Sequence, residues 1–389
     1  MWFTLYYAFV TITFLWMTFA AILQLRWCKR LEPLKAPPPI ETQFESAENS
    51  YVQCSIIVAA RDEESRIEQS IRRLLDQCHV TVEVIVIDDR STDRTEQILR
   101  RIALEDNRVV VQRVVDLPKG WLGKCHACHL GATKAKGDWI LFTDADCWLA
   151  PDAIFRAIRT AESAGVDHLT MTPGIEGASL SAQAWHLALH ISLANWIAGV
   201  NRDRAKAYLG MGAFNLVRSS SYRLCGGYQA LRLTVLDDVR LGLLLRRSGF
   251  RTRAFIGGDD VVCHWGRTAF DMVKIMEKNY FAAMDFRLTV ALVGGLAGLM
   301  FWSSAMVGPL TGTPVGMAAG LAWFSLCIPG YLLNQRLGWR GFGAFLVPLI
   351  LPLLFYAILR SACVTTWQGG VWWRDTFYSL DELRKGSVR

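Results

Sequence analysis

The stretch Trp139-Ile140-Leu141-Phe142-Thr143-Asp144-Ala145-Asp146-Cys147 decides the fold, because an apolar run of strand character delivers two carboxylates into a loop. Side chains alternate along an extended chain, so Asp144 and Asp146 are expected to point to the same side. Such a pair suits one hard divalent cation, Mg²⁺ or Mn²⁺, which prefers oxygen ligands and is commonly shared with substrate phosphates. A bare Asp-x-Asp is more often a solvated turn, so the rest of the chain must decide between the two interpretations.

The residues before this stretch repeat a pattern of strand followed by helix. Continuous, largely β-branched runs predict buried strands, and apolar residues at helical spacing predict helices between them. The predicted strands cover residues 54–60, 82–87 and 109–114, and the predicted helices cover residues 65–77, 95–103 and 125–136. Strands alternating with helices are typical of a mostly parallel sheet wrapped by helices. We therefore expect an α/β, Rossmann-like domain.

Charged residues follow the predicted strands where each one ends. Arg61 follows the first strand, Asp89 ends the second, and Asp144 and Asp146 follow the opening strand. Open α/β sheets bind ligands beyond the carboxyl ends of their strands. Carboxylates gathered at one edge repel each other unless cations or hydrogen-bond donors join them, so a metal and a nucleotide are the expected ligands.

The composition indicates a membrane protein, with 52% hydrophobic residues and 15 Trp among 389 residues. Residues 2–25 carry no charge and are long enough to span a bilayer. The basic residues that follow predict an N-terminus outside and a cytoplasmic domain after it. The absence of a basic region before the run, and of a cleavage site after it, argues against a removable signal peptide. We expect a multi-pass protein of the bacterial inner membrane.

Three further apolar segments lie near the C-terminus, at residues 288–310, 315–333 and 342–363. The expected organisation is a transmembrane helix at 1–26, a linker at 27–50, a cytoplasmic domain at 51–287, transmembrane helices at 288–365 and a polar tail at 366–389. Four crossings would place the basic tail outside, against the positive-inside rule. One segment is therefore expected not to span fully, with Pro348 and Pro352 or the glycines of the second segment marking a re-entrant or tilted element.

The charge and the cysteines argue against two classes of function, nucleic acid binding and haem or zinc binding. The net charge of +7 comes largely from Lys and Arg at the membrane flanks, which indicates anchoring to anionic lipid and gives little support for nucleic acid binding. Ten scattered cysteines facing a reducing cytosol predict free thiols. Cys125-His126-Ala127-Cys128-His129 matches a c-type haem attachment pattern, but it falls inside a predicted helix on the cytoplasmic side. We interpret it as structural, against the alternatives of a haem or zinc site.

Five motifs stand in a fixed order across residues 52–265. They are Ser55-Ile56-Ile57-Val58-Ala59-Ala60-Arg61-Asp62-Glu63, Val86-Ile87-Asp88-Asp89-Arg90-Ser91-Thr92-Asp93, Gly120-Trp121-Leu122-Gly123-Lys124, Thr143-Asp144-Ala145-Asp146 and Leu236-Asp237-Asp238-Val239-Arg240-Leu241-Gly242. This ordered set resembles the family 2 glycosyltransferases, which are inverting nucleotide-sugar enzymes of GT-A fold. With its flanking membrane helices, the chain most resembles the ceramide glucosyltransferase-like and hopanoid-associated branch, and Trp373-Arg374-Asp375-Thr376-Phe377-Tyr378 also resembles that branch.

The resemblance implies a role for each matched residue. Asp89 would accept a hydrogen bond from uracil N3, and Ala59 and Arg61 would surround the base of a UDP-sugar. Asp146, with Asp144 beside it, would hold the metal on the diphosphate. Lys124 would meet the nucleotide or its phosphates from a helix N-terminus, unless it is only a solvated residue of a glycine-rich turn.

The same resemblance makes Asp238 the general base that takes the proton of the acceptor hydroxyl. Asp237 would orient the site or raise the pKa of Asp238 by repulsion. The competing interpretation is an acidic pair at the N-terminus of a helix over residues 237–246.

One motif of the family is absent. Many relatives carry Gln or Arg, two residues, then Arg-Trp near the membrane, but residues 271–286 lack this pattern, leaving Lys274 or Lys278 to supply the charge. Residues 179–200 predict either a core helix or an interfacial helix that guides a lipid acceptor. The expected function is transfer of a sugar to a lipid hydroxyl; the alternatives are transfer to a polyprenyl phosphate and a membrane protein that binds nucleotide-sugar without turnover.

Overall fold

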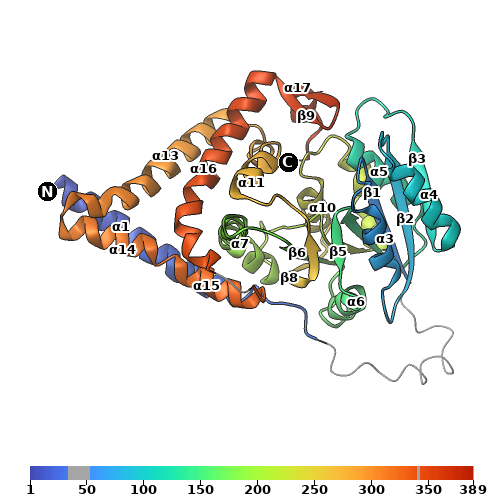
Figure 1. Cartoon of the computed structure of the whole chain (residues 1–389), viewed down its shortest axis with the longest axis horizontal. Helices are drawn as coiled ribbons and strands as arrows, with labels where there is room; N and C mark the ends of the chain where they lie inside the picture. Colours follow the sequence, from blue (N-terminus) through green and yellow to red (C-terminus); the bar gives the residue numbers. More distant parts are fainter. Residues whose placement is uncertain (34–52, 340–341, 389) are drawn as a thin grey trace.

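The computed structural model describes residues 1–33, 53–339 and 342–388 (Figure 1). Most of the linker expected at residues 27–50 lies outside these described ranges. Two parts are distinct in Figure 1: a region built around a sheet, and a group of long helices that extends away from it to the N-terminus.

Eight of the described strands form one sheet in the order β3-β2-β1-β4-β7-β6-β8-β5. Their bounds are β1 Gln53–Ala60, β2 Thr81–Asp89, β3 Val109–Val114, β4 Trp139–Asp144, β5 Cys147–Leu149, β6 His168–Ile175, β7 Asn215–Arg218 and β8 Thr252–Cys263. Strands β3, β2, β1 and β4 run parallel, as expected, and β7 is antiparallel to both β4 and β6. The predicted mostly parallel, Rossmann-like sheet is confirmed, and antiparallel strands extend it on one side.

Helices cover both faces of the sheet because successive strand side chains point to opposite faces. Ile56 and Val58 of β1 belong to a core with α3, α4 and α6, while Ile57 belongs to a second core with Cys125 and Cys128 of α5. The helices of this region are α3 Ile67–Leu75, α4 Thr95–Glu105, α5 Gly123–Lys134, α6 Ala153–Ser163, α7 Leu180–Asn201, α8 Ser219–Leu224, α9 Gly227–Ala230, α10 Asp237–Arg247, α11 Ala269–Met276 and α12 Asn279–Ala283.

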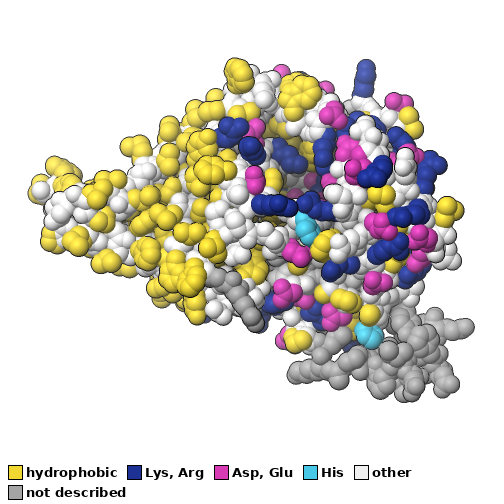
Figure 2. All heavy atoms as spheres, in the orientation of Figure 1, with side chains coloured by type: hydrophobic (Ala, Val, Ile, Leu, Met, Phe, Trp, Pro, Cys, Tyr) yellow, Lys and Arg dark blue, Asp and Glu magenta, His cyan; other side chains and the backbone are white. Residues whose placement is uncertain are grey.

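Four candidate membrane spans match the predicted apolar segments in the described chain: Trp2–Leu25, Leu288–Thr311, Pro314–Arg336 and Gly343–Gln368. They comprise α1 Trp2–Leu25, α13 Leu288–Val307, the 3₁₀ helix η1 Gly308–Thr311, α14 Pro314–Phe324, α15 Cys327–Arg336 and α16 Gly343–Gln368. Figure 2 shows hydrophobic side chains gathered over these helices and charged side chains over the sheet region. The expected arrangement of one N-terminal and three C-terminal candidate spans is therefore confirmed.

Helix α7 lies between the two parts. It packs against α16, α1 and α15 on one side and against β8 on the other. Trp185, Leu187 and Ala188 on this helix are buried, whereas Trp196 is exposed. The helix expected over residues 179–200 is thus mostly a core helix that joins the sheet region to the long apolar helices.

The C-terminal residues expected as a polar tail fold into a hairpin and a helix. The hairpin pairs β9 Gly370–Trp373 with β10 Thr376–Ser379, and α17 Leu380–Gly386 follows it. Ser379 and Glu382 form a capping box at the start of α17. Arg384 donates a hydrogen bond of 2.9 Å to the carbonyl oxygen of Phe286, which attaches this segment to the sheet region.

Candidate active site

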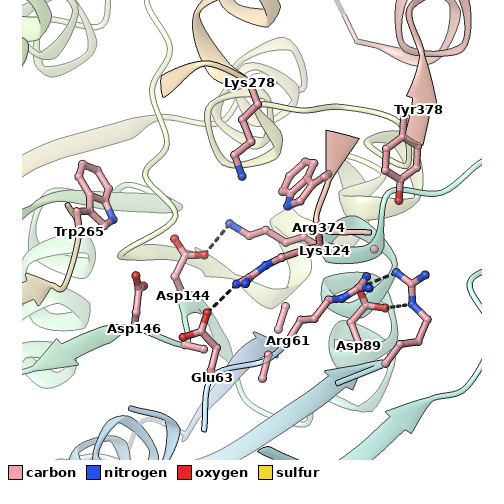
Figure 3. A pocket seen from close by; sticks show the side chains of 16 residues that line it. Arg61, Glu63, Asp89, Lys124, Asp144, Asp146, Trp265, Lys278, Arg374 and Tyr378 are labelled. Atoms are coloured by element: carbon pink, nitrogen blue, oxygen red, sulfur yellow. Dashed lines mark hydrogen bonds and ion pairs between the residues drawn. The ribbon is translucent and has the colours of Figure 1, made fainter. Parts of the chain in front are cut away.

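The parallel register brings the ends of β1, β2 and β4 to one edge of the sheet. Ala60 pairs with Asp88, and Ala59 pairs with Asp144. A cavity of about 240 Å³ opens beyond this edge. Six residues proposed from the sequence line it, namely Ala59, Arg61, Asp89, Lys124, Asp144 and Asp146 (Figure 3).

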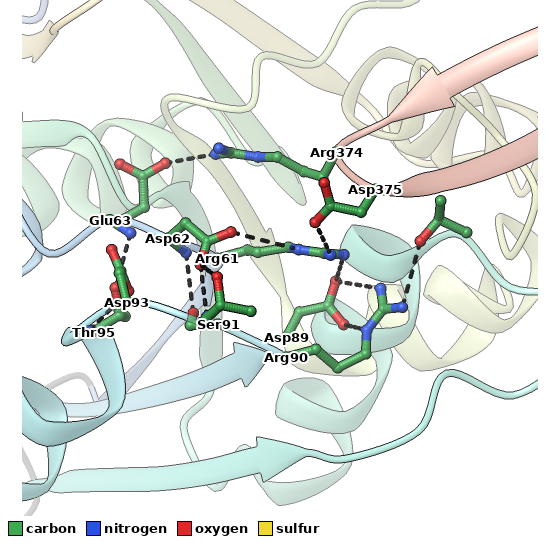
Figure 4. A network of polar contacts seen from close by, with 12 residues as sticks. Arg61, Asp62, Glu63, Asp89, Arg90, Ser91, Asp93, Thr95, Arg374 and Asp375 are labelled. Carbon is green, nitrogen blue, oxygen red and sulfur yellow. Dashed lines mark hydrogen bonds and ion pairs between the residues drawn. The ribbon is translucent and has the colours of Figure 1, made fainter.

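Hydrogen bonds lock the loops after β1 and β2 together beneath this cavity (Figure 4). The Asp62 N–H donates to Ser91 Oγ at 3.0 Å, and the Thr92 N–H donates to Asp62 Oδ1 at 2.7 Å. Asp62 has φ 54° and Arg90 has φ 61°, a left-handed conformation that is uncommon outside glycine. Strained backbone of this kind gathers at functional sites, which fits two loops shaped to present their side chains.

Asp89 is held by two arginines. Arg90 donates from Nε and from one terminal nitrogen to the two carboxylate oxygens of Asp89, at 2.8 and 3.1 Å. Arg61 lies 3.9 Å from Asp89 Oδ2. Each carboxylate oxygen has a second lone pair, so Asp89 keeps the capacity to accept a further hydrogen bond. The pairing with Arg90 was not anticipated from the sequence.

Lys124, in the first turn of α5, bridges two acidic groups. Its Nζ lies 2.6 Å from Asp144 Oδ1 and 3.8 Å from Asp237 Oδ2. Burial acts to lower the pKa of Lys124, but Asp144, Asp237 and Asp238 outweigh it and hold that pKa well above its usual value. Lys124 is therefore a permanent positive charge at the centre of the site. A Cβ at the preceding Gly123 would lie 2.1 Å from Asp89 Oδ2, so only glycine permits this approach.

Asp146 is the least compensated carboxylate of the cavity. Within the described residues no Lys, Arg or His nitrogen pairs with it, whereas Asp144 is paired with Lys124. Burial, then the charges of Asp144 and Glu63, raise the pKa of Asp146 to about 7. In Figure 3 the carboxylates of Asp144 and Asp146 face the same space, as expected, although β4 ends at Asp144 and the turn that follows it, not strand alternation, places Asp146. A carboxylate repelled by two others in a buried site suits a bound divalent cation.

A second, larger cavity of about 470 Å³ adjoins the first. Both are lined by Lys124 and Asp144. Apolar side chains form most of its wall, including Leu189, Leu193 and Trp196 of α7 and Ile275 and Met276 of α11. A polar cavity at the sheet edge therefore meets an apolar cavity lined partly by α7 and α11, two helices that also pack against α16.

Asp237 and Asp238 line the apolar cavity at the start of α10, close to its junction with the polar one. Asp237 is buried and accepts a hydrogen bond of 2.9 Å from the Tyr228 hydroxyl. Asp238 accepts backbone N–H bonds from Gly212 and Val239, each at 2.7 Å, and is less buried than Asp237. Burial first, and then Asp237, raise the pKa of Asp238 to about 6, with Lys124 opposing them.

Several residues that line the site were not assigned a role from the sequence. Glu63 and Arg90 line the polar cavity, and so do Arg374 and Tyr378 of the C-terminal hairpin. Trp265, Lys278 and Trp373 line the polar cavity, the apolar cavity and a third, more open one. The sequence did contain signals for three of these residues. Lys278 was a candidate to replace the absent Arg-Trp motif, and Trp373 and Arg374 belong to the C-terminal motif. Lys274, the other candidate, lines only the open cavity.

The Cys-x-x-Cys-His pattern is not assembled as a metal or haem site. Cys125 and Cys128 are buried in the core beneath α5, whereas His126 and His129 both pack against Trp121. The four side chains therefore do not converge. All ten cysteines are free, as expected.

Comparison with known proteins identifies the sheet region. Residues 55–225 match the model of the family described as Glycosyl transferase family 2. The 4,4'-diaponeurosporenoate glycosyltransferase of Staphylococcus aureus strain bovine RF122 / ET3-1 is 30% identical over 206 residues, which cover 50% of this chain and 51% of that protein. The protein of the same name from strain USA300 is 30% identical over 201 residues, covering 48% and 50%. The chain thus spans about half the length of the curated relatives it matches.

One solved structure shares the fold over nearly the whole chain. A mannosyltransferase from Pyrobaculum calidifontis, in complex with GDP-Man and Mn²⁺, matches with a TM-score of 0.55 and 15% identity, covering 94% of this chain and 99% of that one. The resemblance to the ceramide glucosyltransferase-like and hopanoid-associated branch stays a prediction. Residues 55–225 are a glycosyltransferase domain of family 2, with a GT-A fold, in a chain that also carries four candidate membrane spans.

Proposed function

We propose that this protein is an inverting membrane glycosyltransferase that moves a sugar from a nucleotide donor, expected to be UDP-linked, to a lipid hydroxyl. The observation that carries the proposal is the meeting of two cavities at Lys124 and Asp144, one polar and one lined mostly by apolar side chains. A charged donor and an apolar acceptor need adjoining sites of these two characters.

The polar cavity supplies groups for each part of the donor. Asp89 would accept from the uracil ring, with Ala59 and Arg61 around the base. Asp146 and Asp144 would hold Mg²⁺ or Mn²⁺, which neutralises the charge of the diphosphate when bound. Lys124 would bind the diphosphate from the N-terminal turn of α5, where the helix dipole adds positive potential.

The apolar cavity supports a lipid acceptor, and Asp238 supplies the chemistry. Asp238 would take the proton of the acceptor hydroxyl while the hydroxyl oxygen forms a bond to the anomeric carbon. The bond from that carbon to the diphosphate oxygen breaks on the opposite face, so the configuration inverts and a nucleoside diphosphate leaves. Asp237, held by Tyr228, would keep Lys124 oriented between the two cavities.

The four candidate membrane spans support a location in the membrane, and the charges that flank α1 support a sheet region on the cytoplasmic side. Arg26, Lys29 and Arg30 follow α1 directly. By the positive-inside rule they favour a cytoplasmic sheet region. The donor would then be drawn from the cytosol and the acceptor from the adjacent leaflet of a bacterial inner membrane.

A transfer assay in membranes tests this function. Membranes containing the wild-type protein and radiolabelled UDP-sugars should yield labelled lipid in the presence of Mn²⁺ or Mg²⁺. Asp238→Asn should abolish the product and Asp146→Ala should reduce it strongly, while Asp116→Asn, at an exposed carboxylate outside the cavities, should leave it unchanged. Substantial metal-independent transfer by both variants would overturn the mechanism. Loss of the label in mild acid would instead indicate a polyprenyl phosphate acceptor.

A further inference from the structure

We propose that the hairpin β9–β10 is a lid over the donor, and that Arg374 at its tip binds the donor diphosphate. This inference rests on the proposed function, and it supplies an arginine where residues 271–286 lack the Arg-Trp motif. The hairpin, more than 280 positions further along the chain, reaches back to the loops after β1 and β2 (Figure 4).

Three side chains at the hairpin tip make that contact. Arg374 lies 2.9 Å from Glu63 Oε1, and Asp375 lies 2.9 Å from a terminal nitrogen of Arg61. Thr376 Oγ1 accepts a longer hydrogen bond of 3.4 Å from Arg90. The tip therefore contacts the residues that surround the expected position of the base and diphosphate.

These ion pairs can give way to contacts with a ligand at little cost in stability. The side chain of Arg374 is 46% exposed and that of Asp375 is 80% exposed, and ion pairs with such solvent access contribute little to stability. Arg374 also has φ 54° in the two-residue turn between β9 and β10, where glycine is favoured. An arginine kept in this backbone conformation indicates that its side chain has a use.

The positive charges beside Arg374 favour a phosphate group as its partner. Arg374, Lys124 and Lys278 line the same cavity as Glu63, Asp144 and Asp146. Arginine binds phosphate oxygens through paired, charge-assisted hydrogen bonds. A bound diphosphate would draw Arg374 away from Glu63, which lines the same cavity as Asp144 and Asp146.

The hairpin is also placed to separate the two substrates. Trp373 lines both the donor and the acceptor cavity, and Lys278 Nζ stacks 4.0 Å from the centre of its ring. A shift of the hairpin tip therefore changes the passage between the cavities as well as the cover over the donor.

The test compares nucleotide binding by purified full-length wild-type protein, Arg374→Gln and the control Lys385→Gln. Lys385 is an exposed cation on α17 and lines none of the three cavities. With Mn²⁺ present, Arg374→Gln should weaken UDP binding about tenfold or more, because one charge-assisted contact is lost. Binding of uridine, which has no phosphate, should be unchanged, and Lys385→Gln should match the wild type for both ligands.

The possible results distinguish failure of the lid proposal from failure of the proposed function. The lid proposal fails, and the proposed function stands, if the wild type binds UDP and Arg374→Gln binds UDP as tightly. The same conclusion holds if Arg374→Gln weakens binding of uridine and of UDP by the same factor. If the wild type binds neither UDP nor GDP, the proposed function fails and the lid fails with it.

A second inference comes from the path of α16. We infer that α16 lies along the membrane interface on the side of the sheet region, so that the chain crosses the membrane three times, by α1, α13 and α14–α15. Figure 1 shows α13 leading away from the sheet region, α14 and α15 leading back beside α1, and α16 closing the open end between them.

Both ends of α16 contact the sheet region. At its start, a Cβ on Gly343 would lie 3.2 Å from Gln183 Cβ of α7. Toward its end, Arg360 pairs with Glu277 at 2.8 Å and Ser361 Oγ accepts from the Phe281 N–H at 2.9 Å. After α16 the chain continues into the hairpin that contacts Glu63.

The opposite membrane face is marked by other residues. A Cβ on Gly308, at the end of α13, would lie 3.0 Å from the ring of Tyr7 in the second turn of α1. The start of α14 adjoins the same place, since Gly316 and Gly308 also approach closely. Three crossings from an outside N-terminus end inside, which places the basic C-terminal residues where the positive-inside rule favours them.

Thiol labelling from each side of the membrane tests this path. The exposed Cys78 and Cys363 are replaced by Ser, and one cysteine is added at Leu104, Leu310 or Lys385. Leu104 on α4 is 90% exposed and Leu310 in η1 is 83% exposed. An impermeant maleimide should label Leu104→Cys and Lys385→Cys from one side, and Leu310→Cys from the other. Labelling of Lys385→Cys with Leu310→Cys would show that α16 spans; labelling of all three from one side would show that α13 does not.

Discussion

Lys124 Nζ lies 2.6 Å from the carboxylate of Asp144, at the junction of the polar and apolar cavities. The same ammonium lies 3.8 Å from Asp237. One cation therefore joins Asp144, on the proposed metal-binding side of the site, to Asp237, the neighbour of the proposed base Asp238. A change at Lys124 should affect the chemical step more strongly than the fold.

Lys124→Met is expected to lower kcat/KM for transfer by about 10²- to 10³-fold, the usual effect of removing one preorganised charge from an active site. The diphosphate would lose a positive partner as its charge develops. Initial rates at several donor concentrations measure this. Lys119→Met removes an exposed cation of the loop before α5 and should leave the rate unchanged. A Lys124→Met enzyme with wild-type rates would contradict the assignment.

The rate of transfer should rise with pH through about 6 and then level off. Asp238 must be deprotonated to act as a base, and burial raises its pKa to about 6, with Asp237 adding to the shift. Below that pKa the rate should fall about tenfold per pH unit, because the active fraction falls in that proportion. A pH profile of kcat/KM with saturating donor measures the midpoint.

The shape of that profile also tests Asp237. Asp237→Asn removes a like charge beside Asp238, so the midpoint should move to lower pH even where the maximal rate falls. An unchanged midpoint in this variant, or a wild-type rate that falls as pH rises through 6, would show that Asp238 is not the titrating base.

The predicted part of the fold depends on local patterns. Strands β1, β2 and β4 are rich in apolar residues, and a charged residue ends each strand or follows it directly. Parallel pairing then brings Arg61, Asp89 and Asp144 together without further information. That is why the sheet edge and its lining residues were expected, while their roles in catalysis remain predictions.

The missed part depends on contacts between distant residues. Arg374 and Glu63 are 311 positions apart, and Asp375 and Arg61 are 314 apart. The hairpin residues have no regular pattern of their own, so their position follows only from the path of α16. Helix α16 in turn has the length and composition of a span, and its path becomes visible only when both ends are seen against the sheet region.

Chelation should abolish transfer, and added Mn²⁺ or Mg²⁺ should restore it. Asp146→Ala is expected to raise the metal concentration for half-maximal activity by about tenfold or more, because one charged ligand is lost. A titration of activity against free metal measures the shift. Glu105→Ala, on the exposed end of α4, is the matched control. Activity that survives chelation unchanged in the wild type would remove the metal from the mechanism.

Narrowing the apolar cavity should weaken binding of the lipid acceptor and leave binding of the nucleotide donor unchanged. Leu193 lines this cavity from α7 but does not line the polar one, so Leu193→Trp adds bulk only where the lipid is proposed to lie. We expect the KM for the lipid acceptor to rise about tenfold, equivalent to about 1.4 kcal/mol of lost binding, with UDP affinity unchanged. Ser192→Trp places the same indole on the exposed face of α7, outside the cavity, and serves as the control. If Leu193→Trp leaves the KM for the acceptor unchanged, the lipid does not use this cavity. If it weakens UDP binding as well, the two cavities are one site, and the separation at Lys124 and Asp144 is wrong.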